Sequence, residues 1–561
     1  MVAPRGSGRA PALLIAAMVS LIVPFSLTQP SLADHGWMRT LQEEAAAAAD
    51  GTWSSIFSSD AAVAPQAAAP AAPAAPAAPA APAAPAAAPA AASKAYSYML
   101  TPAQRARGLT YVGSAERLRL ALDRALAKKR LVVTTLGASI TAGAGAFDNL
   151  QDAWVDRLEA WLEAAYRPLG VNTTVSNGAV PGTTSAYMCA CFRRHVPDDV
   201  DVIFLEYAVN DDSRKEPLFH NGARKPFERL IRKLLQLPSR PAVVLLNAYA
   251  WFNTEPFEGV FWSSAEREFQ EFSWYYSLPT VSVKAAVYQD MVAAKEGFGV
   301  HAPRERDQQG LKGKAFYYDY VHPDGNTGHR TMAELAMHLI ETVRRDLQFN
   351  PVSRADGAAA AAPLPRPMVR GNHASLHDTC FVGPSFKDGA VTQHEGWEWI
   401  NEAKGPRPKW GYVAKEPAAT LQMRLNTNVS AGAPDKPVLV QLAHLRSYEH
   451  MGWAEVTCVS GCECPPTRFN GHTSDRKSLL ALHKLFVTQH EACVVAVEVL
   501  QDSDSGEHKV KLAGAIVSDQ AGEQQGLDNA GAVEHVHDIS FRRGGFGHGG
   551  VFDVRNHVRR L

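Results

Sequence analysis

The chain has 561 residues, which is enough for two or more domains. Its formal net charge is -1 and its sequence pI is about 7.1. This balance excludes a basic nucleic-acid-binding protein and a protein that coats anionic membranes by charge. The 7 cysteines are too sparse for a disulfide-rich scaffold, so their positions matter more than their number.

The first 33 residues are organised like a secretory signal peptide. Arg5 and Arg9 precede an apolar run at 12–23, and Ser-Leu-Ala, ending at Ala33, offers the small residues that a signal peptidase accepts. The run is shorter than the roughly 20 residues of a spanning helix, so we favour cleavage over an uncleaved type II anchor. Either route predicts a secreted or lumenal protein, and membrane attachment is expected only with the anchor.

Alanine and proline dominate residues 61–92, and a shorter Ala/Pro segment occupies 358–367. Frequent prolines remove backbone donors and fix φ, so the first stretch should be an extended spacer. It could hold a globular head away from a wall or membrane, or serve only as a linker. The sequence therefore divides into a signal peptide or anchor (1–33), a stalk (34–95), an α/β domain (96–350), a linker (351–370), a β-rich domain (371–518) and a mobile tail (519–561).

The first domain alternates strand and helix patterns, which favours a parallel sheet covered on both faces. Short β-branched, apolar runs predict strands at 131–136, 173–176, 200–205 and 242–247. Helical periodicity predicts helices at 114–128, 153–165, 226–237, 264–275 and 327–347.

Residues with possible catalytic roles follow these strands. Ser139 comes directly after the first strand, Gly182 lies in a glycine-containing loop after the second, and Asn210 follows the third. Asp319 and His322 lie three residues apart before the last helix, where a carboxylate can fix the imidazole tautomer. Singly, each has a plain explanation as a cap, turn or loop residue. Their order and their places at strand ends predict one site.

At these blocks the sequence resembles the SGNH hydrolases, also called the GDSL esterase/lipase superfamily, over residues 132–347. The resemblance implies a flavodoxin-like three-layer α/β/α fold. It implies Ser139 as nucleophile, His322 as base and Asp319 as the partner of that base. It also implies an oxyanion hole formed by Ser139 N–H, Gly182 N–H and the Asn210 side chain.

Two blocks depart from the family pattern. Gly-Ala-Ser replaces the usual Gly-Asp-Ser, and Ala208-Val-Asn-Asp replaces Gly-x-Asn-Asp. Neither change removes a catalytic atom. The serine block also lacks the Gly-x-Ser-x-Gly of α/β-hydrolases, because Thr141 occupies the last position.

The activity implied is hydrolysis of acyl esters, with no metal or organic cofactor. We expect O-acetyl groups on a polysaccharide as substrate, because of the secretory route, the stalk and the aromatic residues of the second domain. An acyltransferase or a lipase would use the same residues. The rival from another class is a non-catalytic wall-binding glycoprotein. Asn172 and Asn428 begin candidate N-glycosylation sequons.

The second domain shows short strand patterns at 420–425, 438–443, 485–488 and 493–500, which predict an antiparallel β-sandwich. Its aromatic cluster favours a core over a sugar-stacking platform; the members are Trp397, Trp399, Trp410 and Tyr412. The domain contains five cysteines, Cys380, Cys458, Cys462, Cys464 and Cys493. Disulfides are favoured over a zinc site for them. Cys189 and Cys191 of the first domain could form a further pair or be partners of the odd thiol. Tail histidines could attract metal, but a solvated tail is favoured; they are His535, His537, His548 and His557.

Overall fold

The computed structural model describes residues 96–211, 216–304, 309–372, 377–403, 409–429, 435–474, 478–518 and 529–531. The predicted signal peptide and stalk lie outside these ranges, as do His535, His537, His548 and His557. Within the described ranges, no helix is long and apolar enough to cross a membrane.

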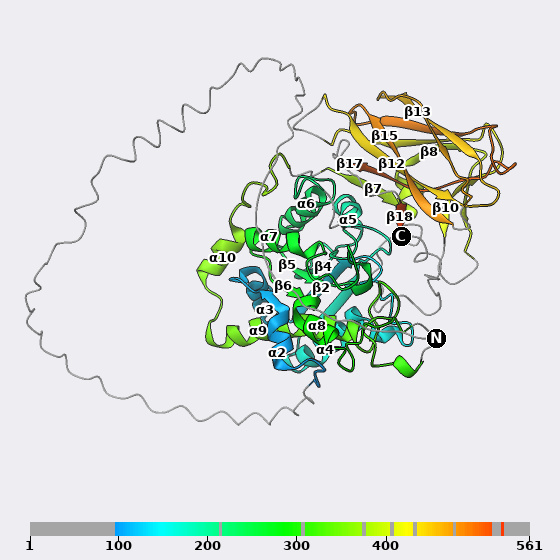
Figure 1. The fold of residues 1–561 in the computed structure, drawn as a ribbon. Coiled ribbons are helices and arrows are strands. Elements are labelled where there is room, and N and C mark those ends of the chain that lie inside the picture. The colour runs from blue at the N-terminus through cyan, green and yellow to red at the C-terminus, as the bar shows by residue number, and fades with distance from the viewer. Residues whose placement is uncertain are drawn as a thin grey trace, which may run out of the picture. The chain divides into compact units, whose positions relative to one another are not determined.

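A six-stranded sheet forms the middle layer of the first domain (Figure 1). Its order is β1-β6-β5-β4-β2-β3, parallel from β6 to β3, with β1 antiparallel at the edge. The strands are β1 (Leu109–Tyr111), β2 (Arg130–Gly137), β3 (Asn172–Asn177), β4 (Val202–Glu206), β5 (Ala242–Asn247) and β6 (Thr280–Ser282). Sequence patterns located β2 to β5 but missed β1 and β6, which are only 3 residues long.

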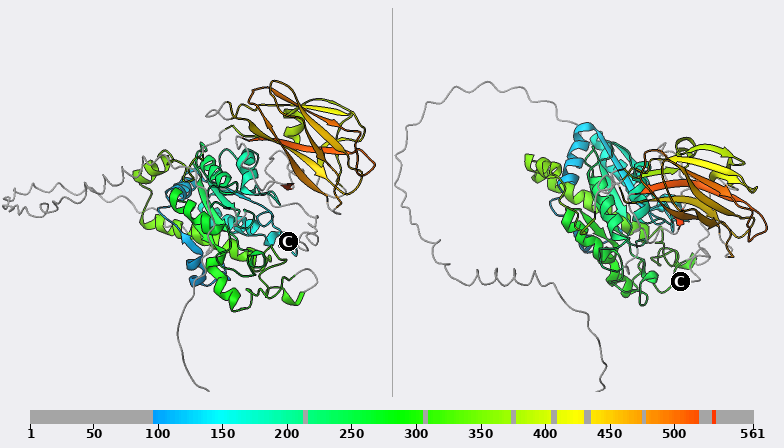
Figure 2. Two further views of the ribbon diagram at one scale, coloured as in Figure 1. Left: turned by 45° about the horizontal axis from the view of Figure 1, so that its top comes forward. Right: turned by 90° about the horizontal axis from the view of Figure 1, so that it is seen from above.

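Helices cover both faces of this sheet (Figure 2). Alternate residues of β4 show the two faces, because Val202 and Phe204 belong to one core and Ile203 and Leu205 to the other. The first core includes α3 (Glu116–Lys128), α4 (Trp154–Tyr166), α8 (Val283–Val292) and α9 (Gly328–Phe349). The second includes α5 (Ser185–Cys191), α6 (Arg224–Leu235) and α7 (Glu266–Tyr276). The predicted three-layer α/β/α architecture is confirmed.

Further short helices complete this part of the chain. They are α2 (Pro102–Gly108), α10 (Arg354–Ala361), η1 (Leu150–Asp152), η2 (Arg167–Leu169), η3 (Phe192–Arg194), η4 (Trp251–Asn253) and η5 (Gln309–Leu311).

The β-rich domain consists of two antiparallel sheets. One has 7 strands in the order β18-β15-β12-β17-β10-β9, with β7 also paired to β17, and the other has 5 in the order β14-β13-β16-β11-β8. The elements are β7 (Thr379–Val382), α11 (Pro384–Gly389), β8 (Val391–Glu395), β9 (Glu398–Asn401), β10 (Trp410–Ala414), β11 (Thr420–Leu425), β12 (Val438–Arg446), β13 (Trp453–Ser460), β14 (Thr467–Asn470), β15 (Leu479–Val487), β16 (Cys493–Val499), β17 (Val510–Ser518) and β18 (Asn529–Gly531). The predicted sandwich-like second domain is confirmed.

The larger sheet is buried on both faces. In β15, Leu485 and Val487 face the sandwich core, whereas Leu480 and Leu482 share a core with α5 and α6 of the α/β domain. This double burial explains why β17 is buried along its whole length.

The aromatic cluster of the second domain belongs mainly to its core, as favoured above. Trp397 and Tyr412 are buried in it and Trp399 packs against it, stacked on Trp410 at 5.9 Å between ring centroids.

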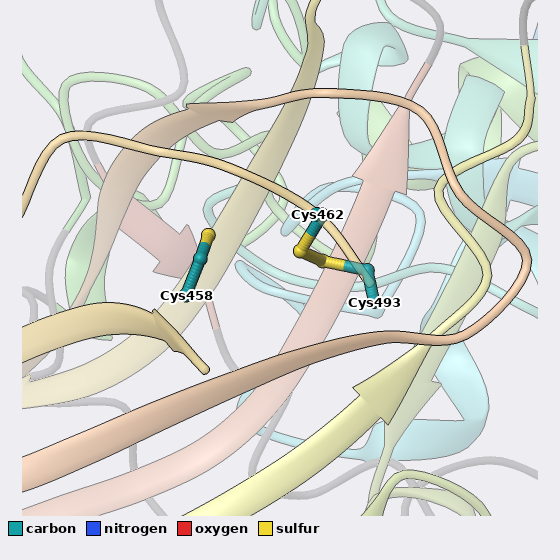
Figure 3. Close-up of side chains that lie close together, drawn as sticks. All are labelled: Cys458, Cys462 and Cys493. Carbon is teal, nitrogen blue, oxygen red and sulfur yellow. A yellow bond between two sulfur atoms is a disulfide. The ribbon is translucent and has the colours of Figure 1, made fainter. Parts of the chain in front are cut away.

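Three disulfides form: Cys191 with Cys380, Cys458 with Cys464, and Cys462 with Cys493. The alternative pair of Cys189 with Cys191 is wrong, because both lie on α5 at a spacing that does not bring side chains to the same helix face. Figure 3 shows Cys458 beside the Cys462–Cys493 disulfide. The sulfurs of this cluster lie close enough for a metal, but their pairing in disulfides removes the thiolates that zinc requires.

Two predicted irregular segments contain regular structure. The proposed linker includes α10, which contacts α3 through an ion pair between Arg119 and Asp356. A capping box from Ser353 starts this helix, and proline is absent until Pro363, so the alanine run can be helical. In the predicted mobile tail, residues 529–531 form β18 and pair with β15.

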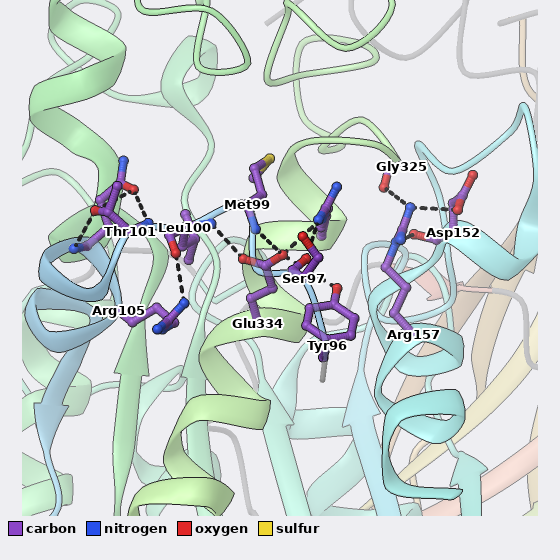
Figure 4. A network of polar contacts seen from close by, with 12 residues as sticks. Tyr96, Ser97, Met99, Leu100, Thr101, Arg105, Asp152, Arg157, Gly325 and Glu334 are labelled. Carbon is purple, nitrogen blue, oxygen red and sulfur yellow. Dashed lines mark hydrogen bonds and ion pairs between the residues drawn. The ribbon is translucent and has the colours of Figure 1, made fainter. Parts of the chain in front are cut away.

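A buried carboxylate fixes the start of the α/β domain (Figure 4). Glu334 on α9 accepts hydrogen bonds from the backbone N–H groups of Met99 and Leu100, both at 2.8 Å, and from Arg330 Nε at 2.9 Å. Its side chain is completely buried. The segment before α2 is therefore attached to α9.

Candidate active site

The serine turn is built by the end of β2. Gly137 closes the strand, and a Cβ at this position would overlap the Thr141 side chain and the backbone of Glu206. The turn continues with Ala142 N–H donating to Ala138 O and Ala144 N–H donating to Ser139 O, each at 2.9 Å. These bonds hold Ser139 beyond the carboxyl edge of the sheet, where it is partly exposed.

Ser139, His322 and Asp319 form a hydrogen-bonded chain. Ser139 Oγ lies 2.8 Å from His322 Nε2, and His322 Nδ1 lies 2.8 Å from Asp319 Oδ2. Ser139 and His322 are 183 residues apart in sequence, so the fold alone brings them together. The geometry allows the imidazole to accept the serine proton while the carboxylate holds the opposite ring nitrogen.

Asp319 is held as a carboxylate. Burial by itself would raise the pKa of Asp319, but hydrogen bonds and the charge of His322 outweigh burial, and the pKa lies below its ordinary value. Asp319 Oδ1 also accepts the backbone N–H of Val321 at 2.9 Å and of His322 at 2.7 Å. The carboxylate thus fixes both the loop and the imidazole.

The histidine loop (residues 319–324) lies directly against the serine turn (residues 137–145). Gly145 has φ +102, and a Cβ there would overlap Pro323 O. His329, completely buried on α9, accepts from Trp154 N–H at 3.2 Å through Nδ1 and contacts Ala144 O at 2.9 Å through Nε2. Because Nδ1 accepts, Nε2 must carry the proton that is donated to Ala144 O. A neutral imidazole therefore joins α4, α9 and the serine turn.

Arg304 joins Asp324, two residues after His322, to Asp148. Its Nε forms an ion pair with Asp324 at 2.7 Å and its terminal nitrogen one with Asp148 at 2.8 Å. Arg304 is 1% exposed, so these charges interact with little screening.

Thr141 links the serine turn to both neighbouring strands. Its hydroxyl donates to Glu206 Oε2 at 2.9 Å, and its carbonyl accepts from Asn177 Nδ2 at 2.7 Å. Asn177 ends β3 and Glu206 ends β4, the two strands that flank β2. Burial, followed by the opposing hydrogen bond of Thr141, sets the pKa of Glu206 at about 8, so its carboxyl is mostly protonated at neutral pH.

The two remaining residues of the predicted site lie in loops at the same edge of the sheet. Gly182 has φ +79 in an exposed turn after β3, and its N–H donates to no acceptor in the described part of the chain. Asn210 follows β4, and its Oδ1 is buried without a hydrogen-bond partner among the described residues. Neighbouring Asp211 accepts from the backbone and hydroxyl of Ser185, which joins the β3 and β4 loops. Their role as oxyanion donors stays a prediction.

Several supporting residues were not found by sequence reasoning. Thr141, Asn177, Glu206, Arg304 and His329 are ordinary polar residues in the sequence. Only their contacts with distant parts of the chain, and burial for all but Asn177, distinguish them. Asn172 and Asn428, the glycosylation candidates, are both exposed.

Two solved structures share the architecture of this chain. A two-domain esterase active on acetylated mannans, co-crystallised with mannopentaose, aligns with 76% of this chain and 100% of its own at 18% identity and a TM-score of 0.53. Another structure of a two-domain esterase active on acetylated mannans covers 73% of this chain and 97% of its own at 18% identity, with a TM-score of 0.52. The chain shares the fold of these two-domain esterases.

The similarity extends across both domains of the first of these esterases, since its whole chain is covered. It therefore includes the β-rich domain as well as the α/β domain. No family model and no curated protein sequence matches the chain.

Proposed function

We propose that this protein is a serine esterase that hydrolyses acyl esters. The observation that carries the proposal is the hydrogen-bonded chain from Ser139 Oγ through His322 to Asp319, at 2.8 Å per step. This order of hydroxyl, imidazole and carboxylate is the arrangement that activates a serine nucleophile.

In the proposed reaction, His322 Nε2 takes the Ser139 proton as Oγ attacks the ester carbonyl. Ser139 N–H, Gly182 N–H and the Asn210 amide donate to the developing oxyanion. The protonated imidazole then gives its proton to the departing alcohol, and the acyl group remains on Ser139. Water, deprotonated by the same imidazole, releases the acid and restores the hydroxyl.

O-acetyl groups on a polysaccharide are the proposed substrate. The support is the shared fold of an esterase active on acetylated mannans, together with a sequence organised for secretion. Three disulfides are consistent with a protein that folds in an oxidising compartment. N-glycosylation at Asn172 and Asn428 belongs to the same proposal.

The proposal is tested by acetate release from 4-nitrophenyl acetate and from acetylated polysaccharides. Ser139→Ala and His322→Ala should each lose activity by at least about a thousandfold, and Asn210→Ala should lower kcat by about a hundredfold because one oxyanion donor is gone. Ser282→Ala, which removes a hydroxyl that caps α8, serves as the matched serine control.

A serine-directed fluorophosphonate separates this proposal from a non-catalytic wall-binding glycoprotein. The wild type should be labelled at Ser139, and Ser139→Ala should not be labelled. Equal acetate release by the wild type and Ser139→Ala would remove Ser139 from the mechanism. Transfer of acetyl to an added sugar, in preference to water, would identify an acyltransferase, and a preference for long acyl chains would identify a lipase.

A further inference from the structure

Four large aromatic side chains are exposed on two loops of the α/β domain. Phe257 is 70% exposed, Trp262 58%, Phe261 46% and Tyr320 41%. Three of them belong to residues 251–263, named here the aromatic loop, and the fourth belongs to the histidine loop. Such exposure of grouped aromatic rings indicates a binding surface.

The aromatic loop lies at the same edge of the sheet as Ser139. It follows β5, which is parallel to β4 and, through β4, to β2. Two strand spacings separate β5 from β2, or about 10 Å. Phe252 packs against Tyr320 with ring centroids 5.4 Å apart, and Tyr320 stands between Asp319 and His322 in sequence. The loop and the catalytic residues therefore form one continuous region.

The aromatic loop is held rigidly. Thr254 Oγ contacts Trp251 O and Phe257 O and accepts from Val260 N–H, all at 3.0 Å. Gly259, at φ +73, packs under the Trp251 ring, where a Cβ would overlap the indole.

Tyrosines of the domain complete the attachment. Tyr288 Oη donates to Gly259 O at 2.6 Å and Tyr249 Oη to Val260 O at 3.1 Å. These bonds fix the loop backbone that carries the exposed rings, so a ligand need not order the loop when it binds.

The residues between the rings identify the ligand. Asn253, Glu255 and Glu258 are exposed among the aromatic residues, and the aromatic loop contains no Lys or Arg. Burying carboxylates in hydrocarbon is unfavourable, so the surface does not suit insertion into a lipid layer. Lys284 Nζ lies 4.5 Å from the Phe261 ring centroid, but this side chain is buried and paired with Glu266. The exposed charge of the aromatic loop is therefore negative, which disfavours an acidic polymer. A neutral sugar chain suits both features, because its C–H faces stack on rings and its hydroxyls bond polar side chains.

We propose that Phe257, Phe261, Trp262 and Tyr320 form a platform that binds neutral pyranose rings of the polysaccharide whose ester is cleaved. The platform rests on the proposed function and specifies which surface recognises the sugar chain. It would position the chain beside Ser139, while the acyl group itself is handled by the catalytic residues.

The test compares two double variants of the full chain. Phe257→Ala/Trp262→Ala removes half of the platform. Phe349→Ala/Trp274→Ala removes side chains of the same types that are 77% and 53% exposed on α9 and α7. Acetate release is measured on acetylated glucomannan, acetylated xylan and 4-nitrophenyl acetate. The ratio of kcat/KM for a polymer to that for the aryl ester should fall about tenfold or more in the platform variant, mainly through KM, because stacking is lost. It should stay within twofold in the control variant.

The outcomes separate this proposal from the esterase assignment. An equal ratio in both variants, or aryl-ester activity in the wild type without activity on any neutral polymer, would overturn the platform and leave the esterase assignment intact. Absence of activity of the wild type on every ester tested would contradict the esterase assignment itself. Sedimentation of the wild type with phosphatidylcholine vesicles, abolished in the platform variant, would overturn the sugar proposal in favour of a lipid surface.

Discussion

Glu206 is a completely buried carboxyl group directly behind the serine turn. Its Oε2 accepts from the Thr141 hydroxyl, and its Oε1 has no partner among the described residues. Since Thr141 is two residues from Ser139, the carboxyl group supports the turn that presents the proposed nucleophile. A small shift of that turn would disturb the 2.8 Å contact between Ser139 and His322.

Glu206→Gln should retain most activity, because the amide oxygen can still accept from Thr141. Glu206→Ala should lower kcat by about tenfold to a hundredfold and destabilise the fold by about 1–3 kcal/mol, because a cavity and an unpaired hydroxyl remain. Kinetics and urea unfolding of both variants measure these effects. Equal kcat in Glu206→Ala and the wild type would show that Thr141 does not position Ser139.

The pH dependence of folding stability gives a second test of the buried Glu206 carboxyl. Burial raises the pKa of Glu206 from 4.5 to about 8, so the neutral carboxyl stabilises the fold fully below pH 4.5, and that stabilisation is lost as pH rises through 8. Glu206→Gln does not titrate. Its stability relative to the wild type should therefore increase between pH 5 and pH 8, with the unfolding midpoint as the measurement.

At the scale of single residues, the sequence indicated the residues of the proposed triad more readily than the residues that support them. Ser139, Asp319 and His322 could be proposed because their residue types, order and strand-end positions carry chemistry. Glu206 and His329 could not, because their importance comes from burial and from contacts across 65 and 185 residues. Those contacts exist only after the sheet and helices have packed.

At the scale of elements, hydrophobic pattern located the long helices and the buried strands. β5 was predicted at its observed bounds, Ala242–Asn247, since its six residues form an apolar run ended by a polar residue. β6 was missed because three residues carry no periodicity, and α10 was mistaken for linker because alanine-rich sequence suits both states. The Cys191–Cys380 disulfide could not be predicted from the sequence either, because it depends on how α5 packs against β7.

The Glu334 carboxylate accepts two backbone hydrogen bonds from residues 96–101, and Arg330 of the same helix, α9, also donates to Ser97 O at 2.7 Å. Glu334→Ala should destabilise the α/β domain by about 2–4 kcal/mol, because two backbone N–H groups and Arg330 lose their acceptor. Glu334→Gln keeps one acceptor oxygen and should lose less. Glu163→Ala, which removes an exposed ion pair with Arg167, is the matched control and should change stability by less than about 0.5 kcal/mol.

Urea unfolding measures these differences, and limited proteolysis near Met99 reports whether the segment detaches. An equal midpoint in Glu334→Ala and Glu163→Ala would show that the buried carboxylate contributes no more than a surface pair. Faster cleavage near Met99 with an unchanged global midpoint would instead show that the segment opens independently of the domain.

At the scale of the whole molecule, the described residues contain three buried histidines besides His322, distributed over both domains. His195 and His329 lie in the α/β domain and His444 lies on β12 of the β-rich domain. Burial lowers the pKa of His195 and of His329 to about 4, and that of His444 to about 3. The two domains share a core and a disulfide, so protonation in either one acts on the same folded unit.

The lowered pKa of these histidines predicts that the folded protein loses stability in acid. Above pH 6.5 these imidazoles are neutral in both states, and their contribution is fully present; as pH falls below 6.5, the unfolded chain gains protons that the folded chain does not bind until about pH 4. Unfolding free energy should therefore fall by up to about 1.4 kcal/mol per pH unit for each histidine. His444→Gln removes one of them and should reduce the slope between pH 6.5 and pH 4.5 by about that amount. Denaturant unfolding across this range measures the slope, and equal slopes in the wild type and His444→Gln would contradict a neutral buried imidazole at this position.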